Sequence, residues 1–144
     1  MVLAFLLVVA ALAVSVFLYF FAGWAPVQKN ITWGINFSQM QAEALGLDWK
    51  ETYLAMLEDL GVKNLKLMTQ WDFVEGKKDD YFFDDIDWQI EQAEVHGAKI
   101  IYVVGMKTGR WPECHQPAWV NGLSKEQQQT QILEYVAKIV NRYK

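Results

Sequence analysis

The opening residues of this chain form one unbroken apolar run, whereas the rest alternates between strand-like and helix-like patterns. No charged side chain occurs from Val2 to Ala22, and the first charged residue is Lys29. In a helix that rises about 1.5 Å per residue, about 20 apolar residues cross the hydrocarbon core of a bilayer. The pattern therefore predicts a transmembrane helix over residues 3–21, within an anchor that comprises residues 1–25.

A signal peptide is the alternative interpretation of this segment. A cleaved signal peptide has a basic stretch, an apolar region of about 7–15 residues and small residues at the cleavage site. Here the apolar run is longer, no basic residue precedes it, and Trp24 and Pro26 make its exit a poor cleavage site. We therefore favour an uncleaved anchor, which a short polar linker at residues 26–30 joins to the remaining chain.

Three apolar runs after residue 30 predict three strands, each followed by an amphipathic helix. The predicted strands cover residues 31–36, 64–69 and 99–104. Capping residues indicate the helix N-termini, and glycines end the first two helices. These capping and terminating residues are Asp48 with Glu51, Asp84, Ser124 with Gln127, Gly61 and Gly97. Alternating strands and helices indicate a parallel sheet, and the continuous apolar run of the third strand predicts that it is covered on both faces.

Two architectures accommodate three such units: an open doubly wound sheet and a (β/α)8 barrel. A nucleotide-binding open sheet has a glycine-rich turn after its first strand, whereas residues 36–39 contain no glycine. The predicted loops at 70–83 and 105–123 are long and carry tryptophans, and barrels place their substrate sites on such loops. We therefore expect an α/β fold in which residues 31–144 form the first three βα units of a (β/α)8 TIM barrel. Because a whole barrel takes about 250 residues, we expect the chain to be a fragment.

Charge and cysteine content exclude several classes of function. The formal net charge is −4 and no basic stripe occurs, which argues against nucleic acid as a partner. Cys114 is the only cysteine, so an internal disulfide is excluded. Cys114 and His115 are adjacent, but a metal site needs three or four ligands with a recognisable spacing. We therefore expect neither a metal ion nor a cofactor.

Side chains on the two long loops are the candidates for substrate binding. Trp71 follows the second predicted strand, where its indole can offer a flat face to a sugar ring; packing over the barrel rim is an equally weighted alternative. The loop after the third strand carries Arg110, Trp111, Glu113 and His115. The three polar side chains can hydrogen-bond sugar hydroxyls, and Trp111 can stack. The alternative is that Arg110 pairs with Glu113 and that the tryptophan anchors a long loop.

Two stretches of the chain resemble a known family. Residues 71–76 (Trp-Asp-Phe-Val-Glu-Gly) and 81–87 (Tyr-Phe-Phe-Asp-Asp-Ile-Asp) are similar to the early barrel of retaining glycoside hydrolases of the β-galactosidase-like and cellulase-like types. Gly97 and the sequence Pro117-Ala118-Trp119 follow in the order typical of these families, so the resemblance covers residues 31–119. It implies a (β/α)8 barrel that cleaves β-linked sugars with two glutamates about 5–5.5 Å apart. In these families the glutamates follow the fourth and seventh strands, and this chain has three, so we assign no catalytic residue.

The favoured function is thus glycoside hydrolase-like cleavage of O-glycosidic bonds in a β-linked oligo- or polysaccharide. The alternatives are a non-catalytic, membrane-anchored glycan-binding module and an anchored α/β domain with an unrelated ligand. A catalytic pair formed by Glu75 and Glu113 is less favoured. Many relatives carry an arginine on the second strand where this chain has Lys66, and lysine lacks the planar fork of arginine. A polysaccharide substrate would place the soluble part outside the cytoplasm.

Overall fold

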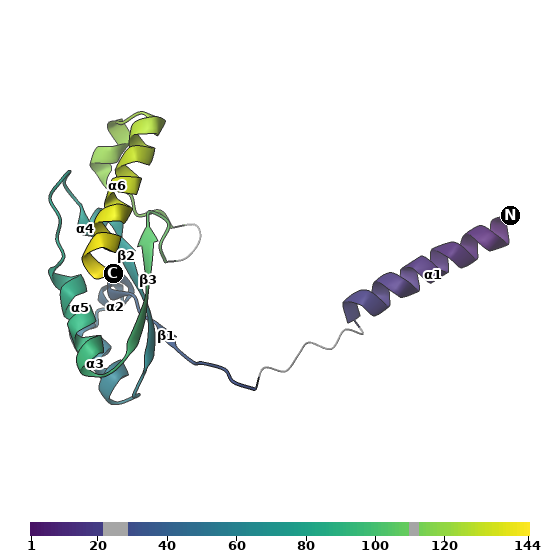
Figure 1. Cartoon of the computed structure of the whole chain (residues 1–144), viewed down its shortest axis with the longest axis horizontal. Helices are drawn as coiled ribbons and strands as arrows, with labels where there is room; N and C mark the ends of the chain where they lie inside the picture. The colour runs from purple at the N-terminus through teal and green to yellow at the C-terminus, as the bar shows by residue number, and fades with distance from the viewer. Residues whose placement is uncertain (22–28, 110–112) are drawn as a thin grey trace. The chain divides into compact units, whose positions relative to one another are not determined.

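The computed structural model describes residues 1–21, 29–109 and 113–144, and the chain divides into two units, Met1–Ile31 and Thr32–Lys144 (Figure 1). The first unit contains helix α1, Val2–Phe21, none of whose side chains is buried. This helix of 20 residues is long and apolar enough to cross a membrane, a description that a signal sequence also meets. The structure therefore confirms a long apolar helix at the predicted position, while most of the predicted linker at 26–30 lies outside the described residues.

The second unit is built on a parallel sheet of three strands in the order β1-β2-β3 (Figure 1). These strands are β1, Ile35–Asn36; β2, Asn64–Gln70; and β3, Lys99–Gly105. The second and third strands match their predicted ranges, but the first is far shorter than the predicted 31–36. Before β1 the chain is held differently, because the Asn64 side chain donates a hydrogen bond to Trp33 O at 2.9 Å. A side chain takes the place of the sheet ladder there.

Among the described residues of this second unit, five α-helices and one 3-10 helix accompany the strands. They are α2, Gln39–Ala44; α3, Trp49–Glu58; α4, Trp71–Val74; α5, Asp84–Val95; η1, Ala118–Gly122; and α6, Lys125–Tyr143. The three long helices follow the three strands as predicted, whereas α2, α4 and η1 lie in segments that the sequence analysis treats as loops. The short helices α2 and α4 directly follow the ends of β1 and β2, so they shape the edge at which these strands end.

Two of the three predicted helix caps are confirmed. Asp48 accepts hydrogen bonds from the backbone N–H groups of Lys50 and Glu51, and Ser124 forms a complete capping box with Gln127. The prediction that Asp84 caps α5 is wrong, because Asp84 is the first helical residue and Phe83 precedes it without a side-chain cap. The first turn of α5 instead carries three aspartates, whose charges interact favourably with the positive end of the helix dipole.

The helices pack against one face of the sheet. Leu65 and Leu67 of β2 lie in register with Ile100 and Tyr102 of β3, and in a parallel sheet such neighbours point to the same side. On this side they contact a core that includes Tyr53 of α3 and Ala93 of α5. Tyr102 also contacts a second cluster, in which Tyr135 and Ile139 of α6 pack on Trp71 and Ile86.

The opposite face of the sheet is open among the described residues. Lys66 and Ile101 are neighbours on it; both residues are exposed, and Ile101 is 69% exposed. The prediction that β3 is covered on both faces is therefore wrong here, because the three βα connections bring their helices to the same side. The structure thus shows a mixed α/β fold with three parallel strands and one covered face.

Candidate functional site

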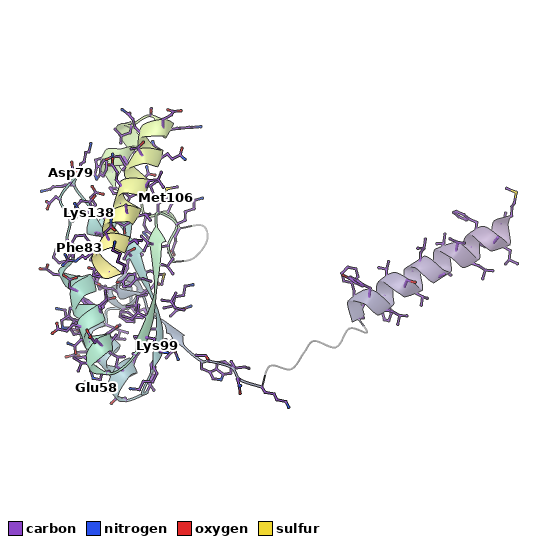
Figure 2. All side chains as sticks on the ribbon, viewed as in Figure 1. Glu58, Asp79, Phe83, Lys99, Met106 and Lys138 are labelled. Carbon is purple, nitrogen blue, oxygen red and sulfur yellow. The ribbon has the colours of Figure 1, made fainter. Side chains whose placement is uncertain are left out.

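The carboxyl ends of the three strands lie at one edge of the sheet, and a concave site is found there. Figure 2 shows Lys99 and Met106 at opposite ends of β3, with Met106 at this edge. A hollow of about 210 Å³, here called the rim hollow, opens between the residues that follow the strands. It is lined by Asn36, Ser38, Gln41, Met68, Gln70, Gly109 and Glu113. Three side-chain amides, one hydroxyl and one carboxylate therefore gather there from the carboxyl ends of all three strands and the segments that follow them.

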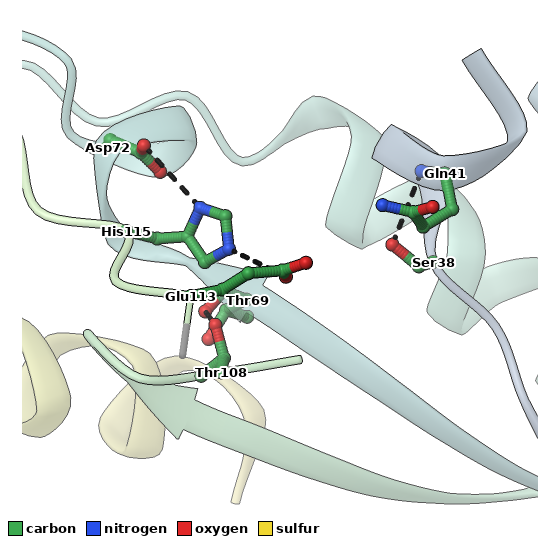
Figure 3. A network of polar contacts seen from close by, with 7 residues as sticks. All are labelled: Ser38, Gln41, Thr69, Asp72, Thr108, Glu113 and His115. Atoms are coloured by element: carbon green, nitrogen blue, oxygen red, sulfur yellow. Dashed lines mark hydrogen bonds and ion pairs between the residues drawn. The ribbon is translucent and has the colours of Figure 1, made fainter. Parts of the chain in front are cut away.

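The first wall of the rim hollow is fixed by the start of α2. Asn36 ends β1, and the next backbone N–H, that of Phe37, donates to Lys66 O at 3.0 Å. Ser38 then caps α2, because its Oγ accepts a hydrogen bond from Gln41 N at 3.4 Å (Figure 3). The cap therefore holds Ser38 and Gln41 together at the end of the strand.

The opposite wall belongs to the loop that follows β3, whose base is tied down twice. Thr108 is buried, and its hydroxyl donates to Thr69 O at 3.1 Å (Figure 3). His115 N donates to Met106 O at 2.6 Å and so closes the loop. Gly109 has φ +102, and a Cβ at this position would lie 3.0 Å from Glu113 Oε2. The backbone conformation thus favours glycine at this position, and a side chain there would also crowd the Glu113 carboxylate.

His115 is buried between two carboxylates. Its side chain retains 10% of its exposure, and Nδ1 lies 3.6 Å from Asp72 Oδ2. Its Nε2 lies 3.4 Å from Glu113 Oε2 on the other side of the ring (Figure 3). The predicted residues Glu113 and His115 therefore do come together. Glu113 faces the rim hollow, whereas His115 lies behind it and has little surface to offer a ligand.

The sequence left two roles open for Trp71, a flat surface for a sugar ring or a packing residue, and the structure places it in the interior. The residue has no exposed surface. Its indole stacks on Tyr135 at 5.6 Å between ring centroids and meets Trp119 edge-on at 5.9 Å. Its Nε1 donates to Glu75 Oε2 at 2.8 Å. Packing is therefore the role that the structure supports, because both the face and the N–H of this indole are occupied by the protein.

Glu75 is likewise part of the framework. The residue is 2% exposed, and its second carboxylate oxygen accepts a hydrogen bond from Asp79 N at 3.0 Å. Burial, together with the charge of Glu75 and a hydrogen bond to it, raises the pKa of Tyr81 to about 12. Both oxygens thus belong to the framework, and the structure gives no support to the less favoured catalytic pair of Glu75 and Glu113.

Two of the predicted site residues lie outside the described part of the chain, and several residues of the site were not predicted. Arg110 and Trp111 lie outside the described residues. The sequence analysis missed Asp72 and the polar residues that line the rim hollow at the ends of β1 and β2. Asn36 and Gln70 carried a usable signal, since each is the last residue of an apolar strand, and ligands of α/β proteins bind at the carboxyl ends of strands.

Within residues 1–21, 29–109 and 113–144, no group of three or more His, Cys, Asp or Glu side chains is arranged to hold a metal ion. Asp72 and Glu113 face opposite nitrogens of the same ring, so a single ion cannot bind all three side chains through these atoms. No protein-family model matches the chain, and no curated protein or solved structure matches it at a significant level. The function must therefore be inferred from the site itself.

Proposed function

We propose that this chain binds a β-linked oligo- or polysaccharide in the rim hollow, as part of a glycoside hydrolase-like (β/α)8 barrel. The observation that carries the proposal is the rim hollow itself. Amides, a hydroxyl and a carboxylate converge there from the connections after all three parallel strands. Such groups pair with sugar hydroxyls, and barrels collect their substrate contacts at this edge. Met68 adds an apolar surface for the C–H groups of a sugar ring.

The arrangement of the helices supports the barrel part of the proposal. Strands that neighbour each other in sequential order, with all their helices on one face, are typical of consecutive βα units of a barrel. A doubly wound sheet carries helices on both faces. In the proposed barrel, the open face with Lys66 and Ile101 is the interior. The carboxyl-end loops then surround the mouth, and the rim hollow forms one sector of it.

Binding without cleavage is the second candidate, and a specific observation favours it. Among the described residues of the connections after β2 and β3, the two glutamates are Glu75 and Glu113. Glu75 accepts hydrogen bonds with both carboxylate oxygens, and the Glu113 carboxylate contacts His115. Neither is placed as the acid/base or nucleophile of a retaining pair. Hydrolysis assays with chromogenic β-glucosides and β-galactosides distinguish the candidates, since turnover supports the hydrolase and glycan binding without turnover supports the binding module.

Helix α1 completes the proposal as a membrane anchor, with the second unit on the outer side where polysaccharides occur. Its length and composition are those of a span. Protease added to intact cells should digest the second unit while leaving a membrane-bound N-terminal piece. Full protection of the second unit until the cells are lysed would contradict an external location.

The direct test of glycan binding is calorimetric titration of the full chain in detergent micelles with cellotetraose and a β-linked galactotetraose. Gln41→Ala, at an exposed residue that lines the hollow, and Glu113→Gln should each weaken binding about fivefold, because one hydrogen bond contributes about 1 kcal/mol. The matched controls Gln129→Ala and Glu91→Gln change exposed residues of α6 and α5 and should leave the affinity unchanged. Equal affinity in all four variants, or no binding by the wild type, would refute the proposal.

Gly109 offers an independent test of the same site. Gly109→Ala should weaken glycan binding, because φ +102 is strained for a residue with a side chain and the new Cβ would lie 3.0 Å from Glu113 Oε2. Gly97→Ala is the control, since Gly97 also has a positive φ, +63, but its Cβ would meet no atom within 4 Å. A loss of affinity confined to Gly109→Ala would show that the conformation of the loop after β3, and not a positive-φ substitution elsewhere, sets the affinity.

A further inference from the structure

A second, smaller cavity adjoins the rim hollow, and we call it the niche. Its volume is about 20 Å³, whereas that of the rim hollow is about 210 Å³. Ser38, Met68 and Gln70 line both spaces, so the niche and the rim hollow meet at these three residues. Most of the remaining wall of the niche comes from α2, from the connection after β2 and from α5.

The size of the niche decides what can enter it. A space that holds one water molecule measures about 10–15 Å³. The niche, at about 20 Å³, therefore admits one small substituent but not a sugar ring. The ring of a bound sugar has to stay in the rim hollow, and only an exocyclic group reaches the niche. In a hexose this group is a hydroxymethyl, in a 6-deoxyhexose a methyl and in a uronic acid a carboxylate, whereas a pentopyranose has none.

Gln70 supplies a buried amide without a protein partner at the junction of the two spaces. The residue is 8% exposed, and its side-chain amide forms no hydrogen bond with another described residue. The other two amides of the niche are used by the protein. Gln39 Nε2 donates to Asp85 Oδ2 at 2.8 Å, and Gln89 Nε2 donates to Gln39 Oε1 at 3.1 Å. Because a buried amide without a hydrogen bond costs free energy, the Gln70 amide is a group that a bound hydroxyl would satisfy.

The chemistry of the wall discriminates among the small substituents. The Gln70 amide can donate a hydrogen bond to a hydroxyl and accept one from it, while Met68, Phe73 and Phe82 offer apolar contact to a methylene. A methyl group would leave the amide unpaired. A carboxylate would approach the carboxylate of Asp85, which also lines the niche, and like charges repel each other. A hydroxymethyl group has one methylene and one hydroxyl, so it matches both parts of the wall.

We propose that the niche receives the hydroxymethyl group of a hexose whose ring lies in the rim hollow, and that the Gln70 amide hydrogen-bonds its hydroxyl. This inference rests on the proposed glycan-binding function and narrows the ligand to chains of β-linked hexoses. Gln70 is then the residue that distinguishes a hexose from a pentose. A pentose chain fits the rim hollow but leaves the Gln70 amide unpaired, so it should bind more weakly.

The first measurement compares ligands on the unaltered chain. Cellotetraose and xylotetraose share the same β-linkage and ring hydroxyls and differ in the hydroxymethyl groups, which only cellotetraose has. Calorimetric titration of the full chain in detergent micelles should give an affinity for cellotetraose at least about fivefold higher, which is the effect of one hydrogen bond. A tetrasaccharide of β-linked glucuronic acid should bind no better than xylotetraose. Equal or tighter binding of either competitor, relative to cellotetraose, would overturn the proposal.

The second measurement assigns the preference to Gln70. Gln70→Met keeps an unbranched side chain of similar length but removes the amide. The affinity for cellotetraose should therefore fall about fivefold, while that for xylotetraose stays the same. Gln41→Ala is the matched control, because Gln41 lines the rim hollow but not the niche. It should weaken both ligands equally and keep the preference. A folded Gln70→Met variant that also keeps the wild-type preference would refute the role of Gln70.

Phe82→Ala tests the niche without a change at a buried position. Phe82 lines the niche but not the rim hollow, and it is 47% exposed. Loss of its apolar contact with the methylene should lower the preference for cellotetraose about two- to fourfold. If urea unfolding shows that Gln70→Met does not fold, this variant decides, and an unchanged preference in Phe82→Ala then contradicts the proposal.

The ligands that bind separate this inference from the function on which it rests. If xylotetraose binds as tightly as cellotetraose, glycan binding stands and the assignment of the niche to a hydroxymethyl group is wrong. If cellotetraose, xylotetraose and a β-linked galactotetraose all fail to bind, the proposed function is wrong and the inference falls with it.

Discussion

Removal of the buried carboxylate of Glu75 should loosen the connection between β2 and α5 by a predictable amount. Its two oxygens accept from Trp71 Nε1 at 2.8 Å and from Asp79 N at 3.0 Å. In Glu75→Gln one oxygen becomes an NH2 group, so only one of these donors keeps its acceptor. The amide oxygen should serve the fully buried indole, while the exposed Asp79 turns its N–H to water. This loss costs about 1–2 kcal/mol of unfolding free energy, in line with the loss of a hydrogen bond to a charged acceptor.

Glu75→Ala should have a larger effect because it also removes the acceptor of the buried indole. An unpaired buried donor and the cavity left by the shortened side chain together cost about 3–5 kcal/mol. Urea unfolding of the full chain in micelles, followed by tryptophan fluorescence, measures both values. Glu91→Gln and Glu91→Ala, at an exposed position of α5, should change the free energy by less than about 0.5 kcal/mol. A Glu75→Ala variant as stable as Glu91→Ala would show that the carboxylate does not support this connection.

Two further predictions concern hydroxyl and carboxyl groups between the helices and the sheet. The buried Tyr102 hydroxyl has no hydrogen-bond partner among the described residues, whereas Tyr53 donates to Gln89 O at 2.8 Å. Tyr102→Phe should therefore raise the unfolding free energy by up to about 1 kcal/mol and Tyr53→Phe should lower it by about 1 kcal/mol; urea unfolding that ranks them in the opposite order would refute this assignment. Hydrogen bonds from Arg142 and Tyr143 hold the pKa of Asp87 below its ordinary value of 3.8. Stability contributed by this group is present above that ordinary value and lost as the pH falls through the lowered folded-state pKa, so the advantage in thermal stability of the wild type over Asp87→Asn should disappear in acid and be constant near neutral pH.

Local signals in the sequence were sufficient for much of the fold. The apolar runs of β2 and β3 gave their ranges nearly to the residue. Gly61 and Gly97 were assigned to helix ends, and both have positive φ. The Ser124 capping box is present as predicted. In each case the interactions that decide the conformation lie within about four residues along the chain, so they can be recognised in the sequence alone.

The features that the sequence analysis missed depend on distant partners. Trp71 at a strand end is compatible with a sugar platform and with a core residue, and the choice depends on Tyr135, which lies on α6. The contact between Asp72 and His115 joins α4 to the loop after β3, so the residues next to either one in the sequence do not reveal it. Likewise, β1 is short because the Asn64 side chain pairs with Trp33 O across the sheet. Only the arrangement of the elements brings such partners together.

The register of β2 explains how one strand supplies both the core and the rim hollow. Leu65 and Leu67 face the helices, whereas Met68 and Gln70 line the hollow. Because successive side chains point to opposite faces, a shift of one residue would exchange the two sets. Exposing either leucine costs about 1.5–3 kcal/mol, so the core fixes the register. The register in turn brings Gln70 to the edge where Glu113 lies. The rim hollow is therefore positioned by packing elsewhere, and substitution of the exposed Gln41 should change ligand binding with little cost in stability, whereas substitution of the buried Gln70 should also lower stability.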